Sequence, residues 1–94
     1  MENNVRIPPI TSLRTAIELF YTQTELGNSE ITQLFGKHSP ATIVRLKKKA
    51  QQKMAELNIQ SWNSNRVSTT AAYAAWGLDI SDLERRYEKV RQLA

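Results

Sequence analysis

Residues 35–50, FGKHSPATIVRLKKKA, place a serine and a proline directly before a run with helical periodicity that contains three consecutive lysines. The Ser39 oxygen can accept a hydrogen bond from an unpaired amide of a first helical turn, and Pro40 suits the first helical position. Apolar residues then recur at three- and four-residue spacing, which predicts a helix from about residue 40 to residue 57 with one buried stripe. The stripe consists of Ile43, Leu46, Ala50, Met54 and Leu57.

Two shorter helices are predicted before this one. Thr11 or Ser12 can cap a first helix whose apolar residues share one face. After a break at ELGNS, Asn28 or Ser29 can cap a second helix, and Gly36 can end it in the left-handed conformation.

Residues 58–67, NIQSWNSNRV, are polar and rich in turn formers. They predict either a loop that lays Trp62 on the core or a short hairpin. Ser68 or Thr69 then starts a predicted fourth helix that Gly77 closes. The aromatic residues of these segments, Trp62, Tyr73 and Trp76, are predicted to pack in the core rather than to stack on bases.

The last segment, DISDLERRYEKVRQLA, has Ser81 and Glu84 at capping-box spacing, which predicts the start of a fifth helix. Its apolar residues follow a heptad seam that can pair with a second copy of the chain or can dock onto the chain's own first helix. A chain of 94 residues has a small core, which favours the first alternative, a homodimer. The predicted seam is Ile80, Leu83, Tyr87, Val90 and Ala94.

Positive charge is concentrated in the middle third of the chain, within a net charge of +4. Residues 37–66 hold seven basic residues and one acidic residue, residues 1–36 hold two and four, and residues 67–94 hold four of each. A polyanionic partner requires such a footprint. Two capped helices joined by a tight turn, the second of them basic, predict a helix-turn-helix that binds double-stranded DNA.

These predictions describe one all-α domain over residues 1–94. Its helix-turn-helix core of three helices covers residues 12–57, and two C-terminal helices for packing or self-association cover residues 68–94.

The stretch NSEITQLFGKHSPATIVRLKKKAQQKMAEL resembles the helix-turn-helix of region four of sigma factors and of response-regulator output domains. The matching positions are Glu30, Ile31, Leu34, Phe35, Gly36, Ser39, Thr42, Ile43, Arg45, Leu46, Met54 and Leu57. The chain departs from the pattern at Lys37 and His38, where those families usually have one apolar residue. The resemblance implies a sequence-specific DNA-binding protein of bacterial or phage type, such as a transcriptional regulator or a recombination or packaging accessory protein.

Helical geometry divides the exposed residues around the third helix into two sets. Arg45 can donate two hydrogen bonds to guanine, and Val44 can contact a thymine methyl group. The predicted base contacts are Ala41, Thr42, Val44, Arg45, Lys48 and Lys49. The predicted phosphate contacts, which fix the register of a protein on DNA, are Lys37, His38, Ser39, Gln52 and Lys53.

Other functional classes find little support in the sequence. There is no cysteine, and His38 is the single histidine, so we expect no bound metal and no cofactor. Neither a glycine-rich phosphate loop nor a nucleophile paired with His38 is evident, which predicts a non-enzyme without an evident small-molecule ligand. No apolar run approaches the roughly 20 residues of a membrane helix, so a cytoplasmic protein without membrane contact is expected. The alternative function is a protein-interaction adaptor whose basic face binds an acidic protein partner.

Overall fold

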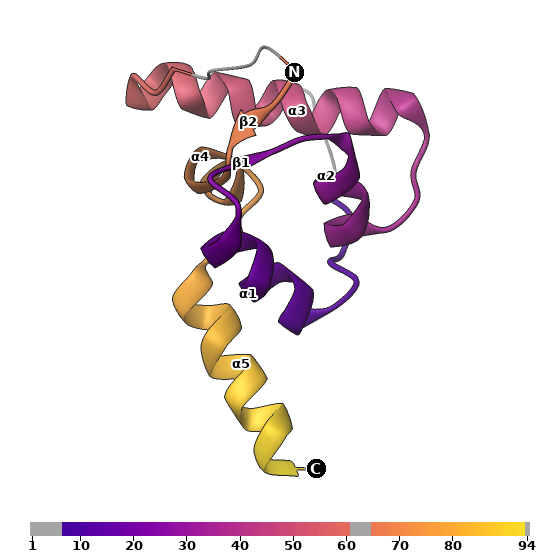
Figure 1. The fold of residues 1–94 in the computed structure, drawn as a ribbon, viewed down its shortest axis with the longest axis vertical. Helices are drawn as coiled ribbons and strands as arrows, with labels where there is room; N and C mark the ends of the chain where they lie inside the picture. The colour runs from indigo at the N-terminus through magenta and orange to yellow at the C-terminus, as the bar shows by residue number, and fades with distance from the viewer. Residues whose placement is uncertain (1–6, 61–64, 94) are drawn as a thin grey trace.

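The computed structural model describes residues 7–60 and 65–93, and most of them are helical. In chain order the elements are α1 (Leu13–Thr22), β1 (Glu25–Leu26), α2 (Asn28–Phe35), α3 (Pro40–Leu57), β2 (Val67–Ser68), α4 (Thr69–Ala75) and α5 (Ile80–Leu93). Figure 1 shows α3 across one end of the molecule, α1 near its middle, and α5 running from beside α1 to the opposite end. The expected helical class is confirmed, with two short strands added to it.

The longest helix, α3, begins and ends where the spacing of its residues predicts. The Ser39 hydroxyl oxygen accepts from the Thr42 amide at 3.3 Å, and Asn58 ends the helix in the left-handed region at φ 62°. The Ile59 amide then donates to the Met54 carbonyl at 2.8 Å, and Ile59 packs against the core. Leu57 was predicted to be buried, but it is 50% exposed, because the chain reverses directly after it.

Both ends of α2 differ from the prediction. Gly27, rather than Asn28 or Ser29, is the N-cap of α2, and its amide donates to the Glu30 carboxylate at 2.8 Å. A side chain at Gly27 would lie 3.0 Å from the Arg66 guanidinium, so the close approach of Arg66 favours glycine here. Gly36 ends α2 with a positive φ of 87° but ψ of −177°, which is an extended conformation that essentially only glycine adopts, not the predicted left-handed helical one.

Helix α5 also starts differently from the prediction. The Asp79 carboxylate accepts from the Ser81 amide at 2.9 Å, so Asp79 and not Ser81 carries the capping interaction. Glu84, the other half of the predicted capping box, accepts instead from the Tyr21 hydroxyl of α1 at 2.8 Å. A partner distant in the sequence has therefore replaced the local one.

The two short strands form an antiparallel pair between segments about 40 residues apart. Leu26 pairs with Val67, and Glu25 pairs with Ser68. The side chains of Leu26 and Val67 are fully buried. The Arg66 guanidinium also donates to the Glu25 carbonyl at 2.8 Å. Val67 pairs with the distant Leu26 and not with a neighbour, as a local hairpin would require. Residues 58–60, 65 and 66 lie outside helices and strands, which agrees with the predicted loop, and Trp62 lies outside the described residues.

Helix α4 packs along the buried side of α3. Its buried Ala71 and Ala72 are small side chains that permit a close approach, and the Trp76 indole N–H donates to the Leu46 carbonyl of α3 at 3.0 Å. The Tyr73 hydroxyl donates to the Ala16 carbonyl of α1 at 2.5 Å. Tyr73 and Trp76 are 1% and 3% exposed, which confirms the predicted core packing of both.

Gly77 closes α4 as predicted, with φ at 74°. The amides of Gly77 and Leu78 donate to the carbonyls of Ala74 and Tyr73 at 3.3 Å and 2.8 Å, which is the hydrogen-bond pattern of a glycine-terminated helix. The chain then turns into α5, which packs on α1 through its first half.

None of the helices in the ranges 7–60 and 65–93 combines the length and the hydrophobicity that crossing a lipid bilayer requires.

The buried Tyr73 hydroxyl generates a test of the core. We expect Tyr73→Phe to lower the free energy of unfolding by about 1 kcal/mol, because one buried hydrogen bond is lost. Burial also raises the pKa of Tyr73 above its ordinary value of 10.0. A raised folded-state pKa means that this stabilisation is complete below about pH 10 and is lost as the pH rises further. Denaturant unfolding of both proteins from about pH 8 to about pH 11 measures this, and an identical alkaline dependence in the two would contradict it.

Candidate nucleic-acid interface

One side of α3 is buried and the opposite side faces solvent. Ile43, Leu46, Ala50 and Met54 are buried against α4 and the strands. Among the predicted base contacts, Ala41, Val44, Arg45 and Lys48 are exposed, and Thr42 and Lys49 are half-buried. The structure therefore brings all six onto the solvent-facing part of one helix.

The basic residues of the middle third do not all contribute to this side. Arg66 lies 3.9 Å from the Glu25 carboxylate and 3.6 Å from that of Glu30, so its charge is used within the fold. Lys53 pairs with Glu56 at 3.2 Å on the surface of α3. Some of the basic residues of the middle third are therefore paired with carboxylates of the chain, and the others lie on the exposed side of α3.

Lys47, the first of the three consecutive lysines, is bound to another helix. Its ammonium group donates to the Asn28 side-chain oxygen at 3.0 Å, which joins α3 to the start of α2. By contrast, no carboxylate of the described residues pairs with Lys37, Arg45, Lys48 or Lys49. We call these four residues the α3 cation set.

The turn between α2 and α3 is organised by side chains. His38 bonds through its Nε2 to the Phe35 carbonyl at 3.0 Å, and the Ser39 hydroxyl lies 3.1 Å from that of Thr42. Lys37 is exposed. Of the predicted phosphate contacts in the turn, His38 and Ser39 therefore already have local hydrogen-bond partners, whereas Lys37 has none among the residues described.

The N-terminal lead-in holds the end of α2, a role that the sequence did not indicate. The Thr11 amide donates to the Leu34 carbonyl at 2.8 Å, and its hydroxyl donates to the Gln33 carbonyl at 2.8 Å. Thr11 had been considered as a cap of α1, but Ser12 fills that position by accepting from the Thr15 amide at 3.2 Å. Thr11 consequently satisfies the carbonyl end of α2 directly before the turn.

Trp76 is a second supporting residue that sequence reasoning placed only in the core. The carbonyl that accepts from its indole belongs to Leu46, the neighbour of Arg45. A buried indole usually finds an acceptor for its N–H, but nothing in the sequence indicates which one. This bond connects the exposed face of α3 to α4 behind it.

The remaining predicted contacts lie further along α3 and on α5. Gln52 is exposed and Lys53 half-buried. On the predicted dimerisation seam, Leu83 is buried within the chain, Ile80 and Tyr87 are half-buried, and Val90 is 54% exposed. Ala94 lies outside the described residues.

In residues 7–60 and 65–93, no group of three histidine, aspartate or glutamate side chains gathers closely enough to hold a metal ion.

The chain matches no known protein-family model, no curated protein and no solved structure.

The Ser39 cap generates a test of how α3 is started. We expect Ser39→Ala to lower the free energy of unfolding by about 1 kcal/mol, because the Thr42 amide loses its acceptor. Ser29→Ala is the matched control, since Ser29 is exposed and α2 is capped at Gly27 instead. Chemical denaturation should show a change of under about 0.5 kcal/mol for the control. Equal losses in the two variants would contradict this assignment of the caps.

Proposed function

We propose that the protein binds double-stranded DNA and that α2, the turn and α3 act as a helix-turn-helix, with α3 in the major groove. The observation that carries the proposal is the α3 cation set, which lies in the turn before α3 and on the solvent side of this helix, whose other side is packed against α4. Cations without carboxylate partners can neutralise phosphates without first breaking an ion pair. The resemblance of residues 12–57 to sigma region four and response-regulator output domains also supports the proposal.

The positions along α3 suggest different roles for its residues. Arg45 is in the second turn of the helix, where a recognition helix contacts base edges. Lys53 lies eight residues later, which is about 12 Å along the axis. We therefore assign Arg45 to the bases and Gln52 and Lys53, further along the helix, to the phosphate backbone.

We also propose that the protein acts as a homodimer on DNA. Leu83 is already used inside the chain, so the second copy would pack on the distal half of α5, where Val90 and Leu93 are 54% and 87% exposed. Figure 1 shows this half extending past α1. A regulatory or accessory role in a bacterial or phage context fits a small dimeric module of this kind.

The DNA proposal is tested by substitutions on α3. We expect Arg45→Ala to reduce discrimination between a selected duplex and random duplexes by about 1–3 kcal/mol, because a base contact is lost. We expect Lys48→Ala to weaken binding to both duplexes about equally and to reduce the salt slope by about 0.9. Selection from a random pool supplies the duplex, and gel shifts at several salt concentrations supply the affinities.

The matched control for Lys48→Ala is Lys89→Ala, which removes an exposed lysine from α5. Its affinity and salt slope should equal those of the unmodified protein. If the unmodified protein binds no duplex at low salt, the DNA proposal is wrong and the adaptor alternative, with an acidic protein on the same face, becomes the better one.

The dimer proposal is tested on α5. Val90→Glu should shift the protein to monomer in sedimentation equilibrium, because a charge would be buried at the proposed contact. Gln92→Glu adds the same charge to the opposite side of the helix and should leave the mass unchanged. A monomeric mass for the unmodified protein at all accessible concentrations would exclude the homodimer.

A further inference from the structure

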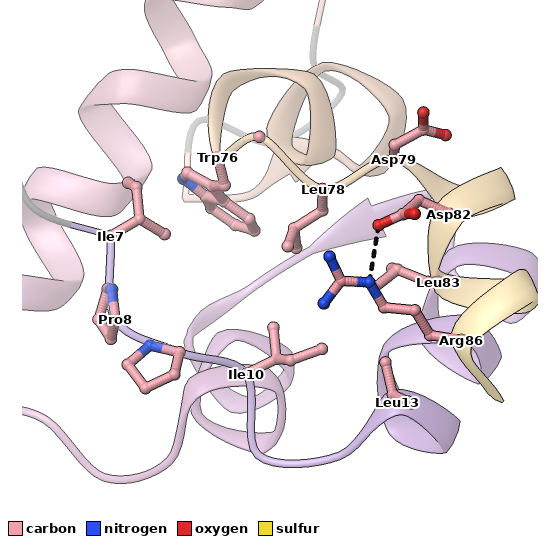
Figure 2. A pocket seen from close by; sticks show the side chains of 12 residues that line it. Ile7, Pro8, Ile10, Leu13, Trp76, Leu78, Asp79, Asp82, Leu83 and Arg86 are labelled. Carbon is pink, nitrogen blue, oxygen red and sulfur yellow. Dashed lines mark ion pairs between the residues drawn. The ribbon is translucent and has the colours of Figure 1, made fainter. Parts of the chain in front are cut away.

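A groove of about 410 Å³ lies away from the cation set, between the N-terminal lead-in and the junction of α4 and α5. Figure 2 shows side chains from the lead-in, from the start of α1 and from α5 facing the same hollow. Its apolar lining is Ile7, Ile10, Leu13, Trp76, Leu78 and Leu83. Polar and apolar atoms contribute about equally to its surface, and its volume is within the range of small-ligand sites.

Three charged side chains line this groove: the carboxylates of Asp79 and Asp82 and the guanidinium of Arg86. The Arg86 Nε lies 2.9 Å from one carboxylate oxygen of Asp82, and Figure 2 shows the two terminal nitrogens of Arg86 directed into the hollow. Neither terminal nitrogen of Arg86 has an acceptor in the part of the chain that the structure describes. The Arg86 guanidinium, oriented by Asp82, therefore faces the apolar side chains of the groove with both terminal nitrogens able to donate.

Asp82 orients the Arg86 guanidinium and binds only its Nε, which leaves the two terminal nitrogens for a ligand. Its other carboxylate oxygen accepts from Arg85 at 2.9 Å, so a guanidinium binds each oxygen. The hydrogen bond from Arg85 and the charges of both arginines hold the pKa of Asp82 below its ordinary value. The carboxylate consequently stays ionised and its two oxygens are occupied.

We propose that this groove binds a small amphipathic carboxylate, with its hydrocarbon part against the apolar lining and its carboxylate on the terminal nitrogens of Arg86. The planar guanidinium can donate two parallel hydrogen bonds to a carboxylate, an arrangement that a neutral hydroxyl cannot match and an ammonium group opposes. The site does not depend on the proposed DNA binding.

The experiment uses Trp76, which lines the groove, as its reporter. Trp62→Phe leaves Trp76 as the sole tryptophan of the chain. Titration with octanoate should change the tryptophan emission saturably, whereas octanol should bind about tenfold more weakly, and octylamine more weakly still. Calorimetric titration of the unmodified chain should give the same order of affinities, which covers the case in which Trp62→Phe does not fold.

Two matched variants assign the carboxylate contact. Arg86→Met keeps an unbranched apolar side chain of similar reach and should weaken octanoate about tenfold while leaving octanol unchanged. Arg85→Met removes the other guanidinium from Asp82, but Arg85 does not line the groove, so octanoate affinity should be retained.

Three outcomes would overturn the proposal: no saturable change with octanoate, equal affinity for octanoate and octanol, or equal losses in the two arginine variants. None of these outcomes bears on the duplex-binding experiment, which uses other residues and no octanoate.

Discussion

Two hydrogen bonds from the α4 segment to carbonyls of other helices connect the α3 and α1 parts of this fold. The Trp76 indole donates to Leu46 of α3, and the Tyr73 hydroxyl donates to Ala16 of α1. Helix α4 has only seven residues, too few to be stable alone in water. It persists because Thr69, Ala71, Ala72 and Tyr73 are buried, and it packs most extensively against α3. Its two hydrogen bonds connect α3, with its cation set, to α1, on which α5 packs.

Because α3 packs on α4, the C-terminal third of the chain supports the proposed DNA interface. Recognition of DNA needs a helix whose position is set by something rigid. Here the support comes from α4 behind α3, from Lys47 and Asn28 between α3 and α2, and from Thr11 at the end of α2. Residues 12–57 alone therefore lack the element against which α3 packs most extensively.

The same tertiary contacts decide which charges remain on the surface. Arg66, Lys47 and Arg45 each add one positive charge to the middle third of the sequence. In the structure, however, Arg66 lies beside Glu25 and Glu30, and Lys47 bonds to Asn28. Near the junction of α4 and α5, Asp82 orients Arg86 towards the groove. Charge density along the chain is accordingly a poor guide to function until the partner of each charge is known.

Local physical chemistry made much of the fold predictable. The Ser39–Pro40 start, the buried stripe from Ile43 to Met54 and the Gly77 stop are encoded within a few residues of where they act, since capping and helical periodicity are short-range effects. The solvent side of α3 follows from the same periodicity. Its predicted contacts with DNA stay predictions, because exposure alone does not identify a partner.

What the sequence could not determine were the contacts between residues far apart along the chain. The pairing of Leu26 with Val67, the bond from Tyr21 to Glu84 and the support of Leu46 by Trp76 each join segments separated by 30 residues or more. Such contacts depend on how whole helices pack, so a local pattern such as the Ser81–Glu84 spacing can be overridden. The sequence by itself determined where most of the helices lie and which side of α3 is buried, and only the tertiary structure decided which polar groups are used internally and where the apolar groove forms.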